Sequence, residues 1–357
     1  MNKDNQSDAP PQPASLVEVR RGSITESRHR GFIVAVTGEG EEIARLGAGE
    51  VLTYLRSSAK PHQAIPLVAT GAADRFNFTP AEIAVACGSH SGETVHTEMV
   101  AAMLAKIKLT KDALHCGTHE PFDKNVAREL RANCIEPDVL QNNCSGKHTG
   151  MIALALHLNA PVETYERPEN PVQKQIAETI AQFSDVALED IAVGTDGCGV
   201  PVFGVTVSRM ALMYARLVAP PADFDKQTRD ACARIVKAMT AHPEMVGGTT
   251  ERLDTELMRA TNGAVISKVG AEGVYTAGVL PSSRFPHGLG LAIKIEDGED
   301  RRARPTVVIE SLRQLGVLDE KALTKLTPYA SFPIKNNLRE TVGQVTPKFN
   351  LKIAVSK

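Results

Sequence analysis

The spacing of apolar residues changes twice along the chain, and these changes limit the folds that it can adopt. In the middle of the chain apolar residues recur at intervals of three and four, which predicts amphipathic helices over 93–107, 146–158, 172–183 and 226–240. Short apolar runs between turn-forming residues predict strands near both ends, over 16–19, 32–36, 43–46, 264–268, 274–277 and 289–295. The segment TGEGEE predicts a hairpin between the second and third of these strands, and a last helix is expected over 304–315.

Strands from both ends can share one sheet, and a sheet needs helices to cover its apolar faces. We therefore predict an α/β fold in which both chain ends form an antiparallel sheet, with helices packed on it and a helical middle region. The sheet region is expected to comprise 15–70 and 241–357, and the mainly helical region 71–240. Residues 1–14 are polar and proline-rich, and we expect a disordered tail because they have too few apolar groups to offset the entropy cost of ordering.

The charge and apolar content of the chain exclude several classes of partner. The 42 acidic and 40 basic side chains are dispersed and sum to a formal charge of -2, so neither nucleic acid nor a membrane is expected as a partner. No apolar run approaches the roughly 18 to 20 residues of a membrane-spanning helix, and no apolar leader precedes the six cysteines. We expect a cytoplasmic protein whose cysteines are free thiols or metal ligands.

Two serine and lysine pairs are candidates for nucleophilic chemistry. Ser57 and Lys60 have Ser-x-x-Lys spacing, which places both on one face of a helical turn. A buried lysine with a lowered pKa can remove the proton of a serine hydroxyl, although this spacing also occurs by chance and then means a surface serine beside a solvated lysine. Ser89, in the small-residue loop 87–92, and Lys268, at the end of a predicted strand, add a second hydroxyl and a second amine.

The order of Ser-x-x-Lys, serine loop and Lys-x-Gly resembles the active site of serine β-lactamases and penicillin-binding proteins. The match is incomplete, because Ser91 stands where those enzymes have asparagine and Val269 where they have threonine. We therefore expect a serine β-lactamase-like fold and catalytic geometry without antibiotic hydrolysis.

Two loops place cysteines beside charged groups, and they are candidates for a metal site. The segments 142–148 and 196–199 contain Cys144, Lys147 and Cys198. Two thiolates and a neutral amine can hold zinc with water in the fourth position, although no CxxC or HExxH spacing supports this and buried free cysteines are common. In the same loops, the amide of Asn143 can bind the carboxylate of a ligand, and the carboxylate of Asp196 can bind a ligand ammonium. Alternatively, both are ordinary turn residues.

Five segments taken together resemble class 3 L-asparaginases, the rhizobial-type, asparaginase II-like group. They are RSSAKPHQ at 56–63, ACGSHSGE at 86–93, NNCSGKHTGM at 142–151, TDGCGVPVF at 195–203 and ISKVGAEG at 266–273. The resemblance covers nearly the whole chain after residue 15. The fold of that family is similar to that of serine β-lactamases and serine-dependent glutaminases, which agrees with the fold expected above.

The resemblance implies a reaction and a role for each candidate residue. It implies hydrolysis of L-asparagine to L-aspartate and ammonia through an acyl-enzyme, by a homodimer with one zinc ion per chain. The implied catalytic residues are Ser57 as nucleophile, Lys60 as its partner, and Ser89 and Lys268 as a second pair. Cys144, Lys147 and Cys198 are implied as zinc ligands, Arg56 as the residue that adjusts charge states, and Asp196 and His148 as contacts to substrate or a bound water.

Other functions remain open at this stage. A serine-dependent glutaminase or a penicillin-binding-type amidohydrolase would use the same chemistry in a different pocket. A threonine-type asparaginase is suggested by Gly-Gly-Thr-Thr at 247–250, although such a loop is usually a turn. A non-catalytic zinc or amino-acid binding protein is a third alternative. His115 and His119 are interpreted as structural, because Gly117 between them disfavours a metal-binding helix.

Overall fold

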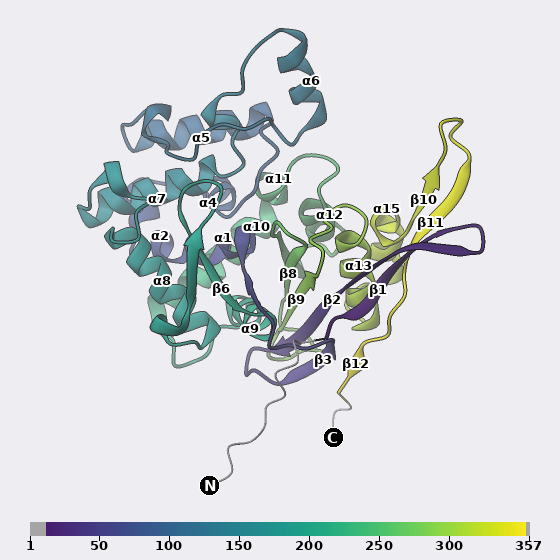
Figure 1. Ribbon diagram of the computed structural model, residues 1–357. Helices are drawn as coiled ribbons and strands as arrows, with labels where there is room; N and C mark the ends of the chain where they lie inside the picture. Colours follow the sequence, from purple (N-terminus) through teal and green to yellow (C-terminus); the bar gives the residue numbers. More distant parts are fainter. Residues whose placement is uncertain (1–11, 355–357) are drawn as a thin grey trace.

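The computed structural model describes residues 12–354, and two antiparallel sheets organise the fold (Figure 1). Of the predicted tail, residues 1–11 lie outside the described residues, and Ala14 already begins the first strand. The larger sheet has the order β10-β11-β1-β2-β9-β8-β7, with β3 paired to both β2 and β12. Its strands are β1 (Ala14–Arg21), β2 (Ile24–Thr37), β3 (Glu42–Leu46), β7 (Val265–Val269), β8 (Val274–Val279), β9 (Leu289–Ile295), β10 (Phe332–Lys335), β11 (Thr341–Pro347) and β12 (Lys352–Ile353).

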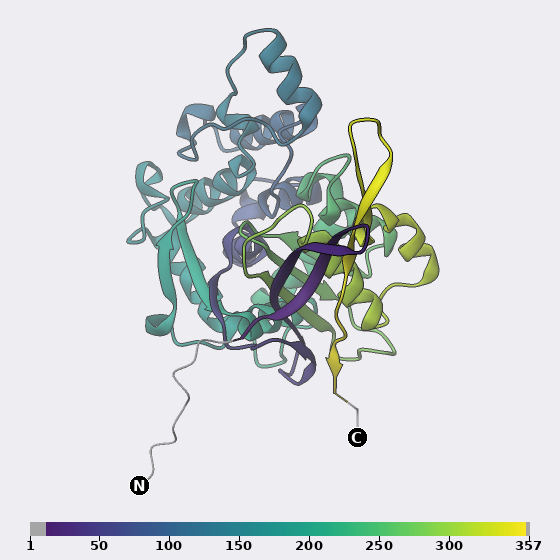
Figure 2. The same ribbon diagram turned by 45° about the vertical axis from the view of Figure 1, so that its right-hand side comes forward.

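The sheet combines strands from both ends of the chain, as predicted. The long strand β2 is the link, because it pairs with β9 from the far end of the sequence, with Val34 opposite Ala292. The predicted hairpin between the second and third strands is confirmed by the pairing of β2 with β3. Strands β10, β11 and β12 have no counterpart among the sequence predictions, and the hairpin of β10 and β11 projects from the body (Figures 1 and 2).

Helices cover both faces of the larger sheet. The helix α9 (Val207–Val218) packs along β9, β8 and β2, and α13 (Arg304–Gln314) packs on the other side. Alternate residues of β2 therefore enter different cores, Val34 on the α9 side and Ile33 on the α13 side. Burial on both faces explains the unbroken apolar run at 32–36.

Gly290 on β9 allows α9 to approach the sheet closely. A Cβ at this position would lie 1.8 Å from the carbonyl oxygen of Ala211 in α9. Any larger residue at position 290 would push the helix away from the sheet, so glycine is required by contact with backbone rather than by a turn.

The remaining helices form the middle region and the cover of the second core. The predicted helices of the middle are confirmed as α5 (Thr94–Lys106), α7 (Ser145–Leu158), α8 (Pro171–Ser184) and α10 (Lys226–Ala241). The others are η1 (Arg56–Ala59), α1 (Lys60–Gln63), α2 (Ile65–Ala69), α3 (Ala72–Arg75), α4 (Pro80–Ala86), η2 (Lys111–Ala113), α6 (Lys124–Ala132), η3 (Val139–Gln141), η4 (Val162–Thr164), η5 (Leu188–Asp190), α11 (Pro243–Val246), α12 (Leu253–Ala260), α14 (Glu320–Lys325) and α15 (Thr327–Ala330). Within residues 12–354, no helix has both the length and the apolar character that a bilayer crossing demands.

A smaller sheet brings distant parts of the sequence to one place. Its strands are β4 (Leu52–Tyr54), β5 (Ala192–Thr195) and β6 (Pro201–Thr206), in the antiparallel order β4-β6-β5. Strand β4 leads directly into η1, and the backbone N–H of Leu55 donates to Phe203 of β6 at 2.9 Å. The turn between β5 and β6 is therefore held beside the start of η1. The division of the chain at 70 and 240 stays a prediction, although β4 pairs across the first of these limits.

Candidate active site

Five segments meet at one end of the larger sheet. They are η1 with α1, the loop after α4, the start of α7, the turn between β5 and β6, and the end of β7. Each predicted site residue lies on one of these segments. The structure therefore brings together residues that the sequence separates by up to about 200 positions.

Ser89 is at the centre of the cluster. Its hydroxyl oxygen lies 2.9 Å from the Nζ atom of Lys60 and 2.9 Å from the Nζ atom of Lys268. The side chain is only 1% exposed, and both lysines are fully buried. Lys60 also donates to the backbone carbonyls of Gly88 at 2.7 Å and Asn143 at 3.1 Å. One hydroxyl thus bridges two buried amines.

Burial sets the charge of these two amines. It removes water from both, which lowers the pKa of Lys60 and lowers that of Lys268 to about 7. For Lys268 the nearby carboxylate of Asp254, 3.8 Å away, acts in the opposite direction, and the positive charge of Lys60 reinforces the lowering. Lys268 is therefore poised to exchange a proton near neutral pH.

Ser57 lies at the edge of this cluster and is half-buried. Within residues 12–354 its hydroxyl makes no hydrogen bond, because the amine of Lys60 is turned toward Ser89 instead. The preceding residue, Arg56, has a positive φ of 50° and donates from Nε to Asp196 at 3.0 Å. The predicted direct contact between the Ser57 hydroxyl and Lys60 is therefore absent among the described residues. Ser57 instead follows the arginine of the Arg56–Asp196 ion pair, and the role of Ser57 as nucleophile stays a prediction.

The predicted zinc ligands converge near Lys60. The Nζ atom of Lys147 lies 3.0 Å from the sulfur of Cys198, and a hydrogen bond from the Cys198 thiol lowers the pKa of Cys144 well below its usual value. All three side chains are buried. Burial alone would lower the pKa of Lys147, but Cys198 and Cys144 outweigh it and the pKa is raised. Among the described residues no three His, Cys, Asp or Glu side chains are grouped as metal ligands, so a metal here would need the lysine.

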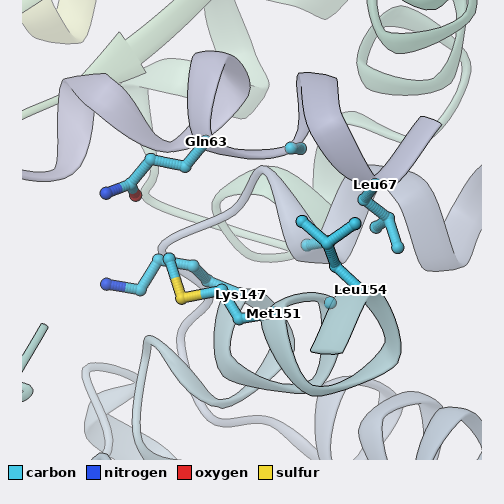
Figure 3. Close-up of a pocket in the computed structure, with 8 residues that line it drawn as sticks. Gln63, Leu67, Lys147, Met151 and Leu154 are labelled. Atoms are coloured by element: carbon cyan, nitrogen blue, oxygen red, sulfur yellow. The ribbon is translucent and has the colours of Figure 1, made fainter. Parts of the chain in front are cut away.

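Lys147 also lines a narrow cavity next to the site (Figure 3). The cavity has a volume of about 10 Å³, which is enough for about one water molecule. Figure 3 shows the polar ends of Gln63 and Lys147 on the same side, while Leu67 and Leu154 close the other. The cavity is therefore lined by polar atoms at one end and by apolar side chains at the other.

The candidate substrate contacts differ in their partners. Burial alone would raise the pKa of Asp196, but Lys147, the N–H of Gly197 and Arg56 outweigh it and the pKa is lowered. Asp196 is therefore a carboxylate at neutral pH. The side-chain oxygen of Asn143 lies 3.4 Å from the sulfur of Cys144. Each side chain is therefore close to one of the predicted zinc ligands, Asp196 to Lys147 and Asn143 to Cys144.

His148 is buried and retains one free hydrogen-bonding atom. Its Nδ1 atom lies 2.6 Å from the hydroxyl of Tyr165, which itself accepts the backbone N–H of His115 at 2.8 Å. Nδ1 is the acceptor that the described residues offer to the tyrosine proton, so we assign that proton to this hydrogen bond and the ring hydrogen to Nε2, an atom with no partner among the described residues. Burial and then the charge of Lys147 lower the pKa of His148 well below its usual value, which keeps the ring neutral.

The sequence interpretation did not identify several residues around the site. Arg252 donates to the backbone carbonyl of Ser89 at 2.7 Å, and His119, interpreted as structural, accepts the backbone N–H of Asn143 at 3.0 Å. Asp254 faces Lys268. Neither spacing nor composition distinguishes these residues from surface side chains. The serine loop that Arg252 contacts lies more than 100 positions earlier in the sequence, and the partner of His119 is in a separate loop.

The rival threonine nucleophile is placed unfavourably. Thr249 is exposed, and its hydroxyl donates to the carboxylate of Glu93. Its backbone N–H donates to the same side chain at 2.9 Å. These contacts are those of a turn stabilised by a carboxylate. No lysine donates to this hydroxyl among the described residues.

The fold and the cluster define an enzyme-type site in which serine hydroxyls meet buried lysine amines. Comparison with known families agrees with this class. The model of the L-asparaginase II family matches residues 17–347, and the chain belongs to this family. The resemblance noted in the sequence is confirmed, and the protein is an amidohydrolase that acts on C–N amide bonds of a small-molecule substrate.

Solved structures show only a distant likeness to this chain. Mglu in its native form matches with a TM-score of 0.44 and 14% identity over 82% of this chain, which spans 66% of Mglu. The Bacillus subtilis glutaminase in covalent complex with 5-oxo-L-norleucine matches with a TM-score of 0.34 and 15% identity, over 84% of this chain and 86% of that protein. No curated protein sequence matches the chain.

Proposed function

We propose that the protein is an L-asparaginase that uses Ser57 as its nucleophile and forms an acyl-enzyme. The observation that supports this proposal is the Ser89 hydroxyl between two buried amines, in a chain of the L-asparaginase II family whose half-buried Ser57 lies three positions before Lys60. A serine needs a neutral base nearby, and burial favours the neutral amine of Lys60 and Lys268.

The proposed proton path follows the hydrogen bonds of Lys60. A neutral amine has two N–H groups and one lone pair. The carbonyls of Gly88 and Asn143 accept the two N–H groups, so the lone pair is left for a hydroxyl proton, from Ser89 or from Ser57. Ser89 can then pass a proton between Lys60 and Lys268, since a hydroxyl both donates and accepts.

The reaction proceeds in two balanced steps. The Ser57 oxygen bonds to the side-chain carbonyl carbon of asparagine as the Lys60 amine turns from Ser89 to take the hydroxyl proton, and the C–N bond then breaks as the lysine and Ser89 relay gives that proton to the departing ammonia. Water next hydrolyses the ester and releases aspartate. The backbone N–H of Ser57 makes no backbone hydrogen bond among the described residues, and we assign it to the developing oxyanion.

Charged and polar groups around Ser57 suit the ends of an amino acid. The carboxylate of Asp196, held by Arg56, is assigned to the substrate ammonium, and the amide of Asn143 to the substrate carboxylate. The unpartnered N–H of His148 calls for an acceptor, which we assign to a bound water or a substrate oxygen. A homodimer in the cytoplasm remains the expected state of the enzyme.

The substrate assignment predicts a strong preference between two amides. We expect ammonia release from L-asparagine with kcat/KM at least about 100-fold above that for L-glutamine, because one extra methylene displaces the amide from Ser57 and misplacement of about 1 Å has this effect. A coupled ammonia assay with both amides measures the ratio.

Three other results would replace the substrate assignment. An equal or higher rate with glutamine would indicate a glutaminase, and hydrolysis of a β-lactam a penicillin-binding-type enzyme. Heat of binding with asparagine but no ammonia would indicate a binding protein.

Zinc fits the side chains that meet at Cys198. Two thiols are ligands that zinc prefers, and with the Lys147 amine as a third, unusual ligand, Cys144, Lys147 and Cys198 would hold one ion. When bound, zinc would supply a Lewis acid that positions a substrate oxygen. The amine of Lys147 must then be neutral, so binding of zinc would release its proton.

The zinc assignment predicts a metal content that depends on Cys198. We expect about one zinc ion per chain in the purified protein and loss of most of it in Cys198→Ala, because removal of one of three protein ligands weakens the site. Metal analysis by mass spectrometry measures this content. The matched control is Cys232→Ala, which removes a buried thiol from α10. Equal zinc in both variants would rule out Cys198 as a ligand.

A further inference from the structure

We propose that Arg252 is a positioning residue for Ser89, because its guanidinium holds the loop that presents the Ser89 hydroxyl to Lys60 and Lys268. This inference deepens the proposed function and rests on it for its kinetic test. Arg252 directly precedes α12, and it lies 163 positions after the serine that it would position.

Three hydrogen bonds connect Arg252 to the serine loop and to its neighbouring segment. Its Nη2 atom donates to the backbone carbonyl of Ser89 at 2.7 Å. Its Nη1 atom donates to the hydroxyl of Ser91 at 2.8 Å and to the carbonyl of Gly247 at 2.9 Å. The two nitrogens of one planar group therefore span the loop on both sides of residue 90. A lysine, with a single nitrogen, cannot reproduce this spacing.

The backbone of Ser89 is anchored at both of its polar groups. Its N–H donates to the carbonyl of Val246 at 2.8 Å, and its carbonyl accepts from Arg252. Both anchors come from the segment 246–252, which runs from the last residue of α11 to the residue before α12. The orientation of the Ser89 side chain thus depends on this segment, and without Arg252 only the Val246 contact would remain.

Arg252 also links the serine loop to the opposite side of the site. Its guanidinium carbon lies 5.7 Å from the ring centre of Phe122, and this ring stacks on His119 at 5.1 Å. His119 in turn accepts the backbone N–H of Asn143, whose carbonyl accepts from Lys60. A continuous series of contacts through Arg252 therefore joins the loop of Ser89 to the loop of Asn143.

The positive charge of Arg252 has a second effect, on Lys268. Burial is the main cause of the lowered pKa of Lys268, and the charges of Lys60 and Arg252 contribute in the same direction. The groups that face Lys268 from the packed elements are Asp254 on α12, Lys60 on α1, Cys144 at the start of α7, Cys87 at the end of α4, and Arg252 itself. Loss of the Arg252 charge raises the pKa of Lys268, while Arg252→Lys retains the charge.

The test compares Arg252→Lys with Arg252→Met, and Arg259→Met is the matched control. Arg259 lies on the adjoining α12 and is exposed, with ion pairs to Glu244 and Glu256. We expect Arg252→Met to lower kcat/KM for asparagine about 100-fold through kcat, the effect of a displacement of about 1 Å. The rising limb of its pH profile should move about 1 pH unit higher. Arg252→Lys should lower kcat while the limb stays in place, and Arg259→Met should change neither.

Hydrogen exchange of the loop supplies a readout that needs no activity. We expect amides of 87–93 to exchange at least about 10-fold faster in both Arg252 variants than in the wild type or Arg259→Met, since the loop has lost a clamp. Unchanged exchange and an unchanged kcat in Arg252→Met would overturn the proposal. If wild-type protein releases no ammonia, the proposed function fails, and the exchange result alone then decides whether Arg252 positions Ser89. If Arg252→Met does not fold, Arg252→Lys decides both readouts.

Discussion

Replacement of Ser57 by alanine is expected to lower ammonia release from asparagine by about 10⁴-fold or more, because the reaction then has no oxygen that can form the acyl-enzyme. Ser89→Ala should retain more activity, with a loss of about 10² to 10⁴-fold, since it removes a proton relay and not the bond-forming atom. The ammonia assay on both variants measures this order. Ser58→Ala is the matched control, because the Ser58 hydroxyl only donates to the carbonyl of Leu55.

The same prediction can be checked without rates. Mass spectrometry of the enzyme stopped during turnover, or treated with a slow substrate analogue, should find the added mass on the peptide that contains Ser57. An ester on Ser89 would reverse the roles of the two serines. An adduct on Cys144 would exclude serine as the nucleophile. Among the described residues, the Ser89 hydroxyl is hydrogen-bonded to two lysines, whereas the Ser57 hydroxyl is not. Because Ser89 is only 1% exposed, we assign the attack on the substrate to Ser57.

The sequence predicted the elements of this fold that have a regular apolar period. Strand β9 and the helices α5, α7, α8 and α10 are close to their predicted bounds, because each buries a continuous stripe or face. Strand β2 was predicted only over its buried half, 32–36, and begins at Ile24, because its first residues are mostly exposed and have no apolar run. Strand β5 and the C-terminal hairpin were not predicted. Half of the residues of β5 are exposed, and the same holds for β10, so neither has an apolar run that stands out from a loop.

The site was predictable where residues lie close in sequence or in a known motif. The spacing of Ser57 and Lys60 and the loops with Ser89 and Cys144 pointed to the residues that the fold brings together. What the sequence could not give is which hydroxyl each amine contacts. That choice is made by tertiary packing: Lys60 begins α1 and turns toward the loop after α4, away from its own serine. The contacts of Arg252 are invisible for the same reason.

Replacement of Lys268 by methionine is expected to lower activity by about 10² to 10⁴-fold and to remove the rising limb of the pH profile near pH 7. The limb is expected because burial lowers the pKa of Lys268 to about 7, so that the amine becomes a base as the pH rises through this value. The pH dependence of kcat/KM in both proteins measures the change. The control is Lys226→Met, which removes an exposed lysine paired with Asp230 on the surface of α10.

The same substitution should change how stability depends on pH, and the sign follows from proton uptake. Between pH 7 and 10.5 the unfolded chain holds a proton on Lys268 that the folded protein mostly lacks. Unfolding then takes up a proton, so the free energy of unfolding rises with pH, by up to about 1.4 kcal/mol per pH unit. Urea unfolding at pH 7, 8 and 9 should show this rise in the wild type relative to Lys268→Met. A constant offset between the two proteins is expected as well, because Asp254 loses its buried partner. Parallel curves would mean that the Lys268 amine keeps its proton in the folded protein, and the lysine could not then serve as a base near neutral pH.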